Sequence, residues 1–222
     1  MFNYIAFEGI DGVGKTTLAK AFSKLLEENG LPTMYTFEPF GMKQEPTQMD
    51  DDVIMMSQLR TFALDKRYED MPSIARELIL LANRSIHHQW LLSKVGCRIL
   101  ITDRCFISAL IYKNMAENTI SDSTWWDIIN QICMKPKLVV YVSSLTPKAN
   151  NDENHFYDSK DKKFFTELEN KYLTELMENP IISKIPMINF KNDFNKTPEQ
   201  NAQELFEYVK QFYQTVVKNA NS

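Results

Sequence analysis

The sequence predicts an α/β fold in which a parallel five-stranded sheet lies between layers of helices. Short apolar runs alternate along the chain with segments of helical period, and this alternation is typical of a parallel sheet. A glycine-rich loop separates the first run from the first helix. With 222 residues, the chain is long enough for one well-buried α/β domain and too short for two large ones.

The glycine-rich loop follows the apolar run Tyr4–Glu8, which we expect to be the first strand. Glycine adopts the positive φ angles that turn successive backbone N–H groups toward an anion, and the following helix adds its positive end. The loop has the pattern G-x-x-x-x-G-K-T and reads Gly9-Ile10-Asp11-Gly12-Val13-Gly14-Lys15-Thr16-Thr17. The pattern predicts a P-loop NTPase fold that binds the phosphates of ATP.

Two residues at the start of the first helix have specific expected roles. Lys15 is expected to reach the β- and γ-phosphates as a catalytic residue, and the Thr16 hydroxyl to ligate the Mg²⁺ that bridges them. A glycine-rich turn beside a surface lysine is the alternative interpretation. The preceding strand and following helix are the context that a phosphate-binding loop needs, and they favour the nucleotide site.

The next elements complete the first half of the sheet. We expect a helix over Leu18–Asn29, ended by Gly30, and a second strand over Thr33–Phe37. This strand ends in a rigid turn, Glu38-Pro39-Phe40-Gly41. The segment 42–70 is undecided, although three successive aspartates, Asp50 to Asp52, favour a helix start there.

The longest helical pattern runs over Ser73–Lys94 and leads to a third strand, Cys97–Asp103. In P-loop proteins a strand of this kind places its terminal carboxylate beside the phosphates and Mg²⁺. Asp103 is therefore a candidate metal ligand and catalytic residue.

The remaining elements continue the alternation of strands and helices. Residues 143–163 have no apolar period and are expected to form a loop or lid. The other elements are expected as helices at 106–117 and 123–133, a strand at 138–142, a helix at 164–177, a strand at 186–190 and a last helix at 198–217.

Composition excludes several kinds of partner. A net charge of −4 gives no basic footprint for nucleic acid. No apolar run reaches the length of a membrane span, and the N-terminus shows no signal-peptide pattern. Three cysteines without zinc spacing, Cys97, Cys105 and Cys133, indicate reduced, mostly buried thiols. These features predict a cytoplasmic protein, in the host cytoplasm if the source is a virus.

The glycine loop, the Glu38-Pro39 turn, an arginine on a long helix and the Asp103-Arg104 pair follow one another in the order found in thymidylate kinases. The chain resembles this family over nearly its whole length. The resemblance implies one nucleoside monophosphate kinase domain over residues 1–222, with a lid at about 143–163. It also implies a homodimer.

The resemblance assigns roles to residues of the acceptor site. It implies that Asp11 contacts the 3′-hydroxyl of the deoxyribose and that Arg104 holds the acceptor 5′-phosphate as a catalytic residue. Tyr112 matches the family tyrosine that disfavours a 2′-hydroxyl, and Ser108 falls on the same helix face. Arg84 matches the arginine presented to the pyrimidine carbonyl, although a single arginine on a helix is more often a salt-bridge residue.

The chain departs from the family pattern in three places. Leu80 stands where the family stacks an aromatic ring on the base, which leaves dUMP open as an acceptor beside dTMP. The basic residue that many relatives have near the Glu38-Pro39 turn is missing. Neither the loop nor the lid has an arginine, and the cations available in the lid are His155, Lys148, Lys160, Lys162 and Lys163.

The predicted reaction is transfer of the ATP γ-phosphoryl group to the 5′-phosphate of a deoxypyrimidine monophosphate in dTTP biosynthesis. A deoxynucleoside kinase is one alternative, which would leave Arg104 without an acceptor phosphate. A non-kinase P-loop ATPase or switch is another. Two further pairs of residues have no assigned role. His87 and His88 are expected at the helix surface or rim, not as ligands, whereas Trp125 and Trp126 fit a dimer surface and a core or rim position equally well.

Overall fold

The computed structural model describes residues 3–42, 50–145 and 162–220, and it contains a five-stranded parallel sheet in the order β2-β3-β1-β4-β5. The strands span Tyr4–Glu8 (β1), Thr33–Phe37 (β2), Ile99–Asp103 (β3), Leu138–Ser143 (β4) and Met187–Lys191 (β5). The predicted fold class is confirmed. β3 begins two residues later than expected, because residues 97–98 belong to the turn that follows the long helix.

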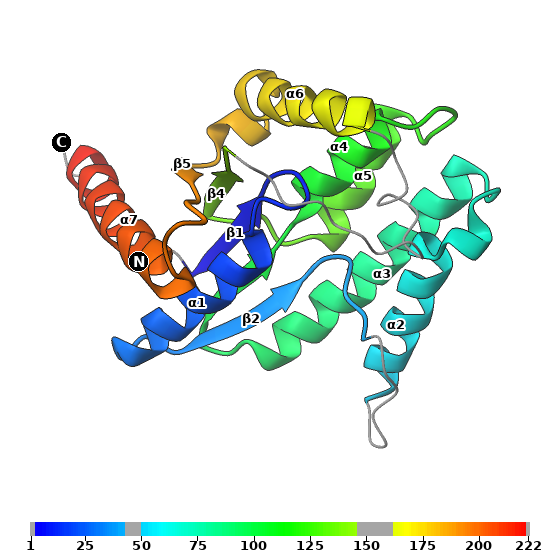
Figure 1. Ribbon diagram of the computed structural model, residues 1–222. Coiled ribbons are helices and arrows are strands. Elements are labelled where there is room, and N and C mark those ends of the chain that lie inside the picture. The colour runs from blue at the N-terminus through cyan, green and yellow to red at the C-terminus, as the bar shows by residue number, and fades with distance from the viewer. Residues whose placement is uncertain (1–2, 43–49, 146–161, 221–222) are drawn as a thin grey trace.

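Helices cover both faces of the sheet (Figure 1). α1 packs against α7, α3 against α5, and α4 against α6. The helices span Lys15–Glu28 (α1), Asp51–Leu64 (α2), Ser73–Lys94 (α3), Phe106–Asn114 (α4), Asp122–Ile132 (α5), Lys162–Glu178 (α6) and Pro198–Ala220 (α7), with short 3₁₀ turns at Lys66–Tyr68 and Ile182–Lys184.

The core lies on both sides of the central strands. Every residue of β1 and β3 is buried, as expected for strands with helices on both faces. Trp125 of α5 is fully buried and packs edge to face against the half-buried Trp126, with ring centroids 5.0 Å apart. The core interpretation of Trp125 is therefore correct.

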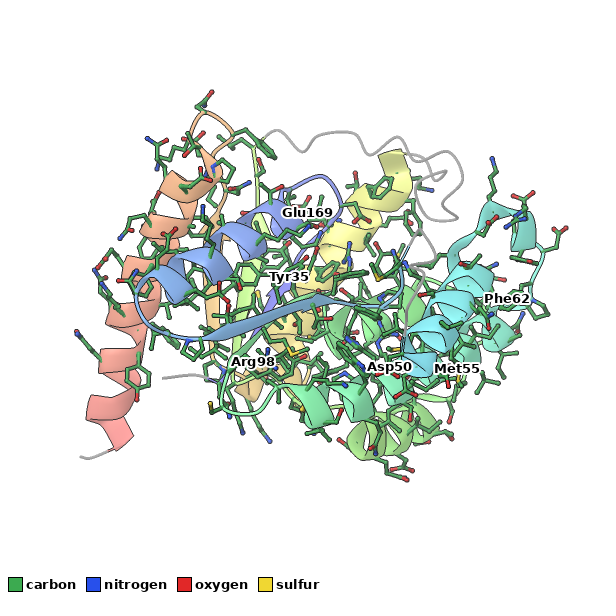
Figure 2. The ribbon with its side chains drawn as sticks, turned by 90° about the horizontal axis from the view of Figure 1, so that it is seen from below. Tyr35, Asp50, Met55, Phe62, Arg98 and Glu169 are labelled. Carbon is green, nitrogen blue, oxygen red and sulfur yellow. The ribbon has the colours of Figure 1, made fainter. Side chains whose placement is uncertain are left out.

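The undecided segment after β2 contains α2, which packs along α3. Its acidic start acts as a cap, because the Asp50 side chain accepts a hydrogen bond from the Asp52 N–H at 3.3 Å. Met55 and Phe62 lie on the outer side of α2 and are nearly half exposed (Figure 2). α2 therefore has one face against α3 and one apolar face toward solvent.

One sequence expectation, on the cysteines, needs correction, and another, on the lid, falls mostly outside the described residues. Cys97 is exposed and Cys133 half-buried, so only Cys105 fits the expectation of buried thiols, although all three are free. Most of the expected lid, residues 146–161, lies outside the described part of the chain. Among the described residues, no helix is both long and apolar enough to span a bilayer.

Candidate active site

The glycine loop between β1 and α1 closes tightly against neighbouring backbone. Gly9 has a φ of +138°, and a Cβ there would collide with the carbonyl oxygen of Val142. Gly14, with a φ of +87°, lies so close to Asn192 that a Cβ would come 2.5 Å from its Nδ2 atom. The same Nδ2 group donates to the Val13 carbonyl at 2.9 Å. Both glycines are therefore required by conformation and by space.

Lys15 is buried at the beginning of α1. Its Nζ donates to the Ile10 carbonyl at 2.7 Å and lies 3.8 Å from Oδ1 of Asp11. Burial and the nearby positive charge of Arg104 lower the pKa of Lys15 to about 8, against the opposing effect of Asp11. The positive charge of the Lys15 ammonium group is therefore only partly neutralised by Asp11, the carboxylate of the loop.

Thr16 and Asp103 come together from different elements. β1 pairs with β3 so that Phe7 lies opposite Asp103, which brings the end of β3 beside the loop. The Thr16 hydroxyl donates to Oδ2 of Asp103, whereas the buried Oδ1 atom of Asp103 has no hydrogen-bond partner among the residues that the structure describes. A hydroxyl beside a carboxylate oxygen is a donor set that suits Mg²⁺, and the orphaned Oδ1 fits such an ion.

Arg104 directly follows β3 with a φ of 71°, a left-handed conformation unusual for a residue other than glycine. Its backbone N–H donates to the Phe7 carbonyl at 2.8 Å. Nη2 of its guanidinium lies 2.5 Å from Oδ1 of Asp11. Nη1 bonds to Ser108 at 3.0 Å and to the Tyr172 hydroxyl at 2.9 Å. The strained backbone thus directs the guanidinium into a fixed set of acceptors.

Asp11 links the loop to α4. Tyr112 of α4 donates its hydroxyl to Oδ2 of Asp11 at 3.0 Å, opposite the Arg104 contact. Although burial opposes ionisation, Arg104 and Lys15 hold the pKa of Asp11 well below its usual range. Asp11 is therefore ionised, and it connects Arg104 and Tyr112, two residues that the resemblance places around the acceptor.

A buried carboxylate at the end of β1, Glu8, supports this arrangement. It accepts from the backbone N–H groups of Cys105 and Ser108 at 2.8 and 3.2 Å, and from the Ser108 hydroxyl at 2.5 Å. Tyr172 of α6 donates to the same carboxylate at 3.1 Å. Neither Glu8 nor Tyr172 was predicted as a site residue. Tyr172 in particular is a single tyrosine on a helix, and no motif spacing distinguishes it.

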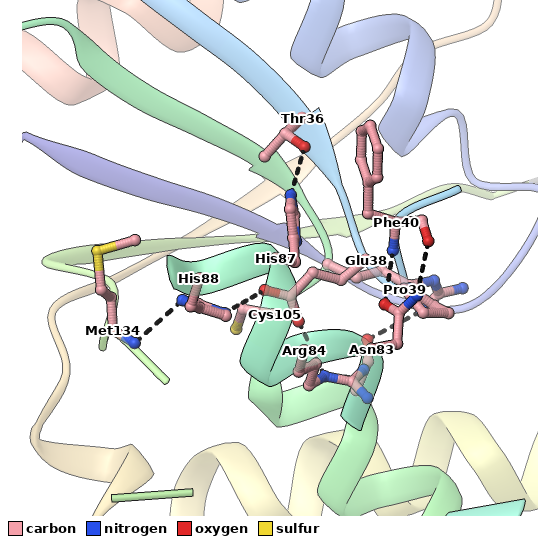
Figure 3. A network of polar contacts seen from close by, with 12 residues as sticks. Thr36, Glu38, Pro39, Phe40, Asn83, Arg84, His87, His88, Cys105 and Met134 are labelled. Atoms are coloured by element: carbon pink, nitrogen blue, oxygen red, sulfur yellow. Dashed lines mark hydrogen bonds and ion pairs between the residues drawn. The ribbon is translucent and has the colours of Figure 1, made fainter. Parts of the chain in front are cut away.

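A second buried network lies at the turn after β2 (Figure 3). The Glu38 carboxylate is buried and accepts from Arg84 Nε at 3.0 Å and from His88 Nε2 at 2.9 Å. His87 bonds to the Thr36 hydroxyl at 2.9 Å. The expectation that both histidines lie at the helix surface or rim is wrong: both are buried, because α3 packs this side against β2 and its turn.

One cavity of about 810 Å³ brings the predicted residues together. The predicted residues that line it are Asp11, Lys15, Thr16, Glu38, Pro39, Leu80, Arg84, Asp103, Arg104, Ser108 and Tyr112. The other loop residues predicted to bind ATP are not among those that line it: Gly9, Gly12, Val13, Gly14 and Thr17. Arg60, Arg76 and Lys113 also line the cavity and were not predicted. The cavity is rich in cations, as expected for a site that binds phosphorylated ligands.

Comparison with known proteins decides the family. The family model described as thymidylate kinase matches residues 7–189. The chain belongs to the thymidylate kinase family. It is therefore an ATP-dependent nucleoside monophosphate kinase of the kind expected from its motifs.

Thymidylate kinases from distant organisms resemble the chain along most of its length. A probable thymidylate kinase of Sulfurisphaera tokodaii is 28% identical over 182 residues, covering 78% of this chain and 85% of the relative. The thymidylate kinase of Mycoplasma capricolum is 25% identical over 219 residues, covering 94% and 96%. The crystal structure of thymidylate kinase from Ehrlichia chaffeensis shares the fold, with a TM-score of 0.64 and 19% identity over 93% of this chain and 97% of that one.

Proposed function

We propose that this kinase transfers the γ-phosphoryl group of ATP to the 5′-phosphate of dTMP, and that it also accepts dUMP. In the transfer, an oxygen of the acceptor phosphate forms a bond to the γ-phosphorus while the bond from that phosphorus to the β–γ bridging oxygen breaks. The products are ADP and the deoxynucleoside diphosphate. Family membership supports the reaction, and Leu80 in the cavity wall supports the wider acceptor range.

The donor side of the proposed site is the glycine loop. Lys15 would neutralise the β- and γ-phosphates, and the loop N–H groups from Gly9 to Thr17 would bind the phosphate oxygens. Thr16 and Asp103 would hold Mg²⁺, which supplies charge neutralisation to the phosphates. This chemistry needs positioning more than a nucleophilic side chain.

The acceptor side is built around Arg104, and its contacts are the observation that carries the proposal. The guanidinium is fixed by Asp11, Ser108 and Tyr172 at the mouth of the loop, where a phosphate of the acceptor would face the donor. Tyr112 and Asp11 would contact the sugar, and Arg84 and Leu80 the base. Glu38 and Pro39 would form the wall beside Arg84.

The proposal extends to the organisation of the protein. We place the whole reaction in a single domain over residues 1–222, with a lid at about 143–163, in a cytoplasmic enzyme. Exposed apolar residues on α2 and α3, including Ile54, Met55, Phe62, Ile74 and Leu78, support a homodimer packed through these helices.

A panel of acceptors tests the reaction. With ATP and Mg²⁺, we expect ADP release with dTMP and dUMP and none above background with thymidine, because thymidine has no phosphate for Arg104. Turnover with thymidine and not with dTMP would indicate a deoxynucleoside kinase. Slow ATP hydrolysis unaffected by any nucleotide would contradict the kinase proposal.

A further inference from the structure

Glu77 of α3 is a buried carboxylate in the wall of the cavity, with 8% of its surface exposed. Its Oε2 atom accepts a hydrogen bond from the backbone N–H of Ile120 at 3.0 Å. Its Oε1 atom is buried and has no hydrogen-bond partner among the residues that the structure describes. The chain thus holds one oxygen of the carboxylate and leaves the other without a donor.

The missing donor distinguishes Glu77 from the other acids that line the cavity. Asp11 and Glu38 each accept hydrogen bonds from two side chains. Asp103 also has an oxygen without a partner in the described part of the chain, but it lies beside the glycine loop, where it would hold Mg²⁺. Glu69 is exposed. Because a buried acceptor without a donor costs free energy, Glu77 indicates a ligand group that carries an N–H or O–H.

Glu77 shares one face of α3 with two residues of the proposed base site. It lies three residues before Leu80 and seven before Arg84, so the three side chains follow one side of the helix, and all three line the cavity. Nε of Arg84 is fixed by Glu38 at 3.0 Å, and the Nη groups provide further donors. A base packed on Leu80 would therefore have donors on one side and the Glu77 acceptor on the other.

The charges around Glu77 come from α4 and α5. Nζ of Lys113 lies 2.6 Å from Oδ1 of Asp122, so the lysine charge is already paired. Burial raises the pKa of the Glu77 carboxyl; the Ile120 N–H and Lys113 oppose this shift, and Asp122 adds to it. A donor from a ligand would stabilise a carboxylate that the protein itself compensates only in part.

We propose that Glu77 sets the base specificity of the acceptor site by accepting a hydrogen bond from the N3–H group of the base. The inference rests on the proposed function and deepens it. Thymine and uracil have a carbonyl at C4 beside an N–H at N3, which complements the donors of Arg84 and the acceptor of Glu77. Cytosine has an amino group at C4 and a bare nitrogen at N3, so both contacts are reversed. The two residues together would accept dTMP and dUMP and reject dCMP.

Glu77→Gln tests this inference by exchanging the acceptor for a donor. The glutamine carbonyl can keep the bond from the Ile120 N–H, which places the amide NH₂ where the unpartnered oxygen lies. Calorimetric titration is expected to show dTMP and dUMP binding weakened about 10- to 100-fold. Binding of dCMP should be unchanged or tighter, because the NH₂ group can donate to N3 of cytosine. Glu77→Leu removes the acceptor and should also lower the preference for dTMP over dCMP.

Asp122→Asn is the matched control. It removes a negative charge from the same cluster, but its side chain is largely exposed and does not line the cavity. The ratio of dTMP to dCMP affinity should stay within about twofold of the wild-type ratio.

An unchanged preference would overturn the inference. If both Glu77 variants keep the ratio of dTMP to dCMP affinity within about twofold of wild type, Glu77 supports the packing of α3 and does not contact the base. The ratio is measured within one protein, so a general loss of folded protein cancels. The proposed function is judged separately, by turnover of dTMP with ATP and Mg²⁺ in the wild type. Turnover with an unchanged ratio refutes only the role of Glu77, and a changed ratio without turnover refutes only the kinase reaction.

Discussion

The imidazole of His88 lies with Nε2 2.9 Å from Oε1 of Glu38, while its Nδ1 accepts the backbone N–H of Met134 at 3.1 Å. Since Nδ1 accepts a hydrogen bond, the ring proton is on Nε2 and is donated to Glu38. Burial opposes ionisation of Glu38, but His88 and Arg84 keep the pKa of its carboxyl below the usual range. His88 thus helps to hold the carboxylate that orients Arg84.

Replacing His88 by leucine is expected to loosen Arg84 without touching the reacting phosphates. The predicted result is a KM for dTMP raised about three- to tenfold, with kcat within twofold, and a loss of about 1 to 3 kcal/mol in unfolding free energy. His88→Gln retains an N–H donor and should retain most of both quantities. A fall in kcat with unchanged KM would contradict the positioning role. Steady-state kinetics and urea unfolding measure the two effects.

His87 predicts how stability depends on pH. Burial lowers the pKa of His87 to about 4, with Glu38 opposing the shift, whereas the unfolded chain has the ordinary value near 6.5. The unfolded state therefore binds the proton first, and the unfolding free energy falls as pH drops from about 6.5 toward 4. This pKa shift corresponds to a loss of about 3 kcal/mol in unfolding free energy.

Urea midpoints measured between pH 7 and 4 test this contribution. His87→Phe should be less stable at pH 7, because the Thr36 hydroxyl loses its partner. Its midpoint should nevertheless decline less steeply than the wild type as the pH falls. Parallel slopes for the two proteins would show that His87 does not titrate as its burial predicts.

Much of this fold was predictable, because each element has a local signal. Each of these signals extends over only a few residues. Examples are the loop glycines, the apolar run that ends at Asp103, and the glycine and proline at helix ends. The networks that orient the site join distant parts of the chain: Tyr172 reaches Glu8 across 164 positions, and Arg60 reaches Pro39 from a segment without strong period. Such contacts have no sequence pattern of their own.

The same reason explains the wrong expectation for His87 and His88. Two adjacent histidines on a helix predict a polar surface, since most polar residues are exposed. Here each one has a buried partner contributed by another element: the Thr36 hydroxyl for His87, and Glu38 together with the Met134 N–H for His88. Only tertiary structure provides those partners.

The lowered pKa of Lys15 predicts an upper pH limit on the use of ATP. Because its pKa is lowered to about 8, the free enzyme loses the ammonium charge above that pH. We expect kcat/KM for ATP to fall about tenfold per pH unit above 8, and Lys15→Ala to abolish phosphoryl transfer. Asp11 raises the pKa of Lys15, so Asp11→Asn should move the break to lower pH. A flat profile up to pH 10 would contradict this assignment.

The Tyr172 hydroxyl connects α6 to Arg104 through a hydrogen bond, which predicts an effect of this residue on the acceptor site. Tyr172→Phe removes the hydroxyl that contacts Arg104, Ser108 and Glu8, which leaves a buried carboxylate short of one donor. The expected cost is about 1 to 3 kcal/mol of stability and about a tenfold loss in kcat/KM for dTMP. Tyr141→Phe is the control, since the Tyr141 ring packs 6.1 Å from that of Tyr172. Equal effects of both substitutions on kcat/KM would exclude a specific role for the Tyr172 hydroxyl.

Leu80 predicts weak discrimination between thymine and uracil. It lines the cavity four residues before Arg84 and offers an apolar contact without a ring to stack on the base. One methyl group is worth about 1 kcal/mol of burial, so kcat/KM for dTMP and dUMP should differ less than about tenfold. Leu80→Phe should tighten binding of both bases by stacking and increase the preference for dTMP by closing the wall around the methyl. A wild-type enzyme that rejects dUMP more than about 100-fold would show that other residues of the cavity recognise the methyl.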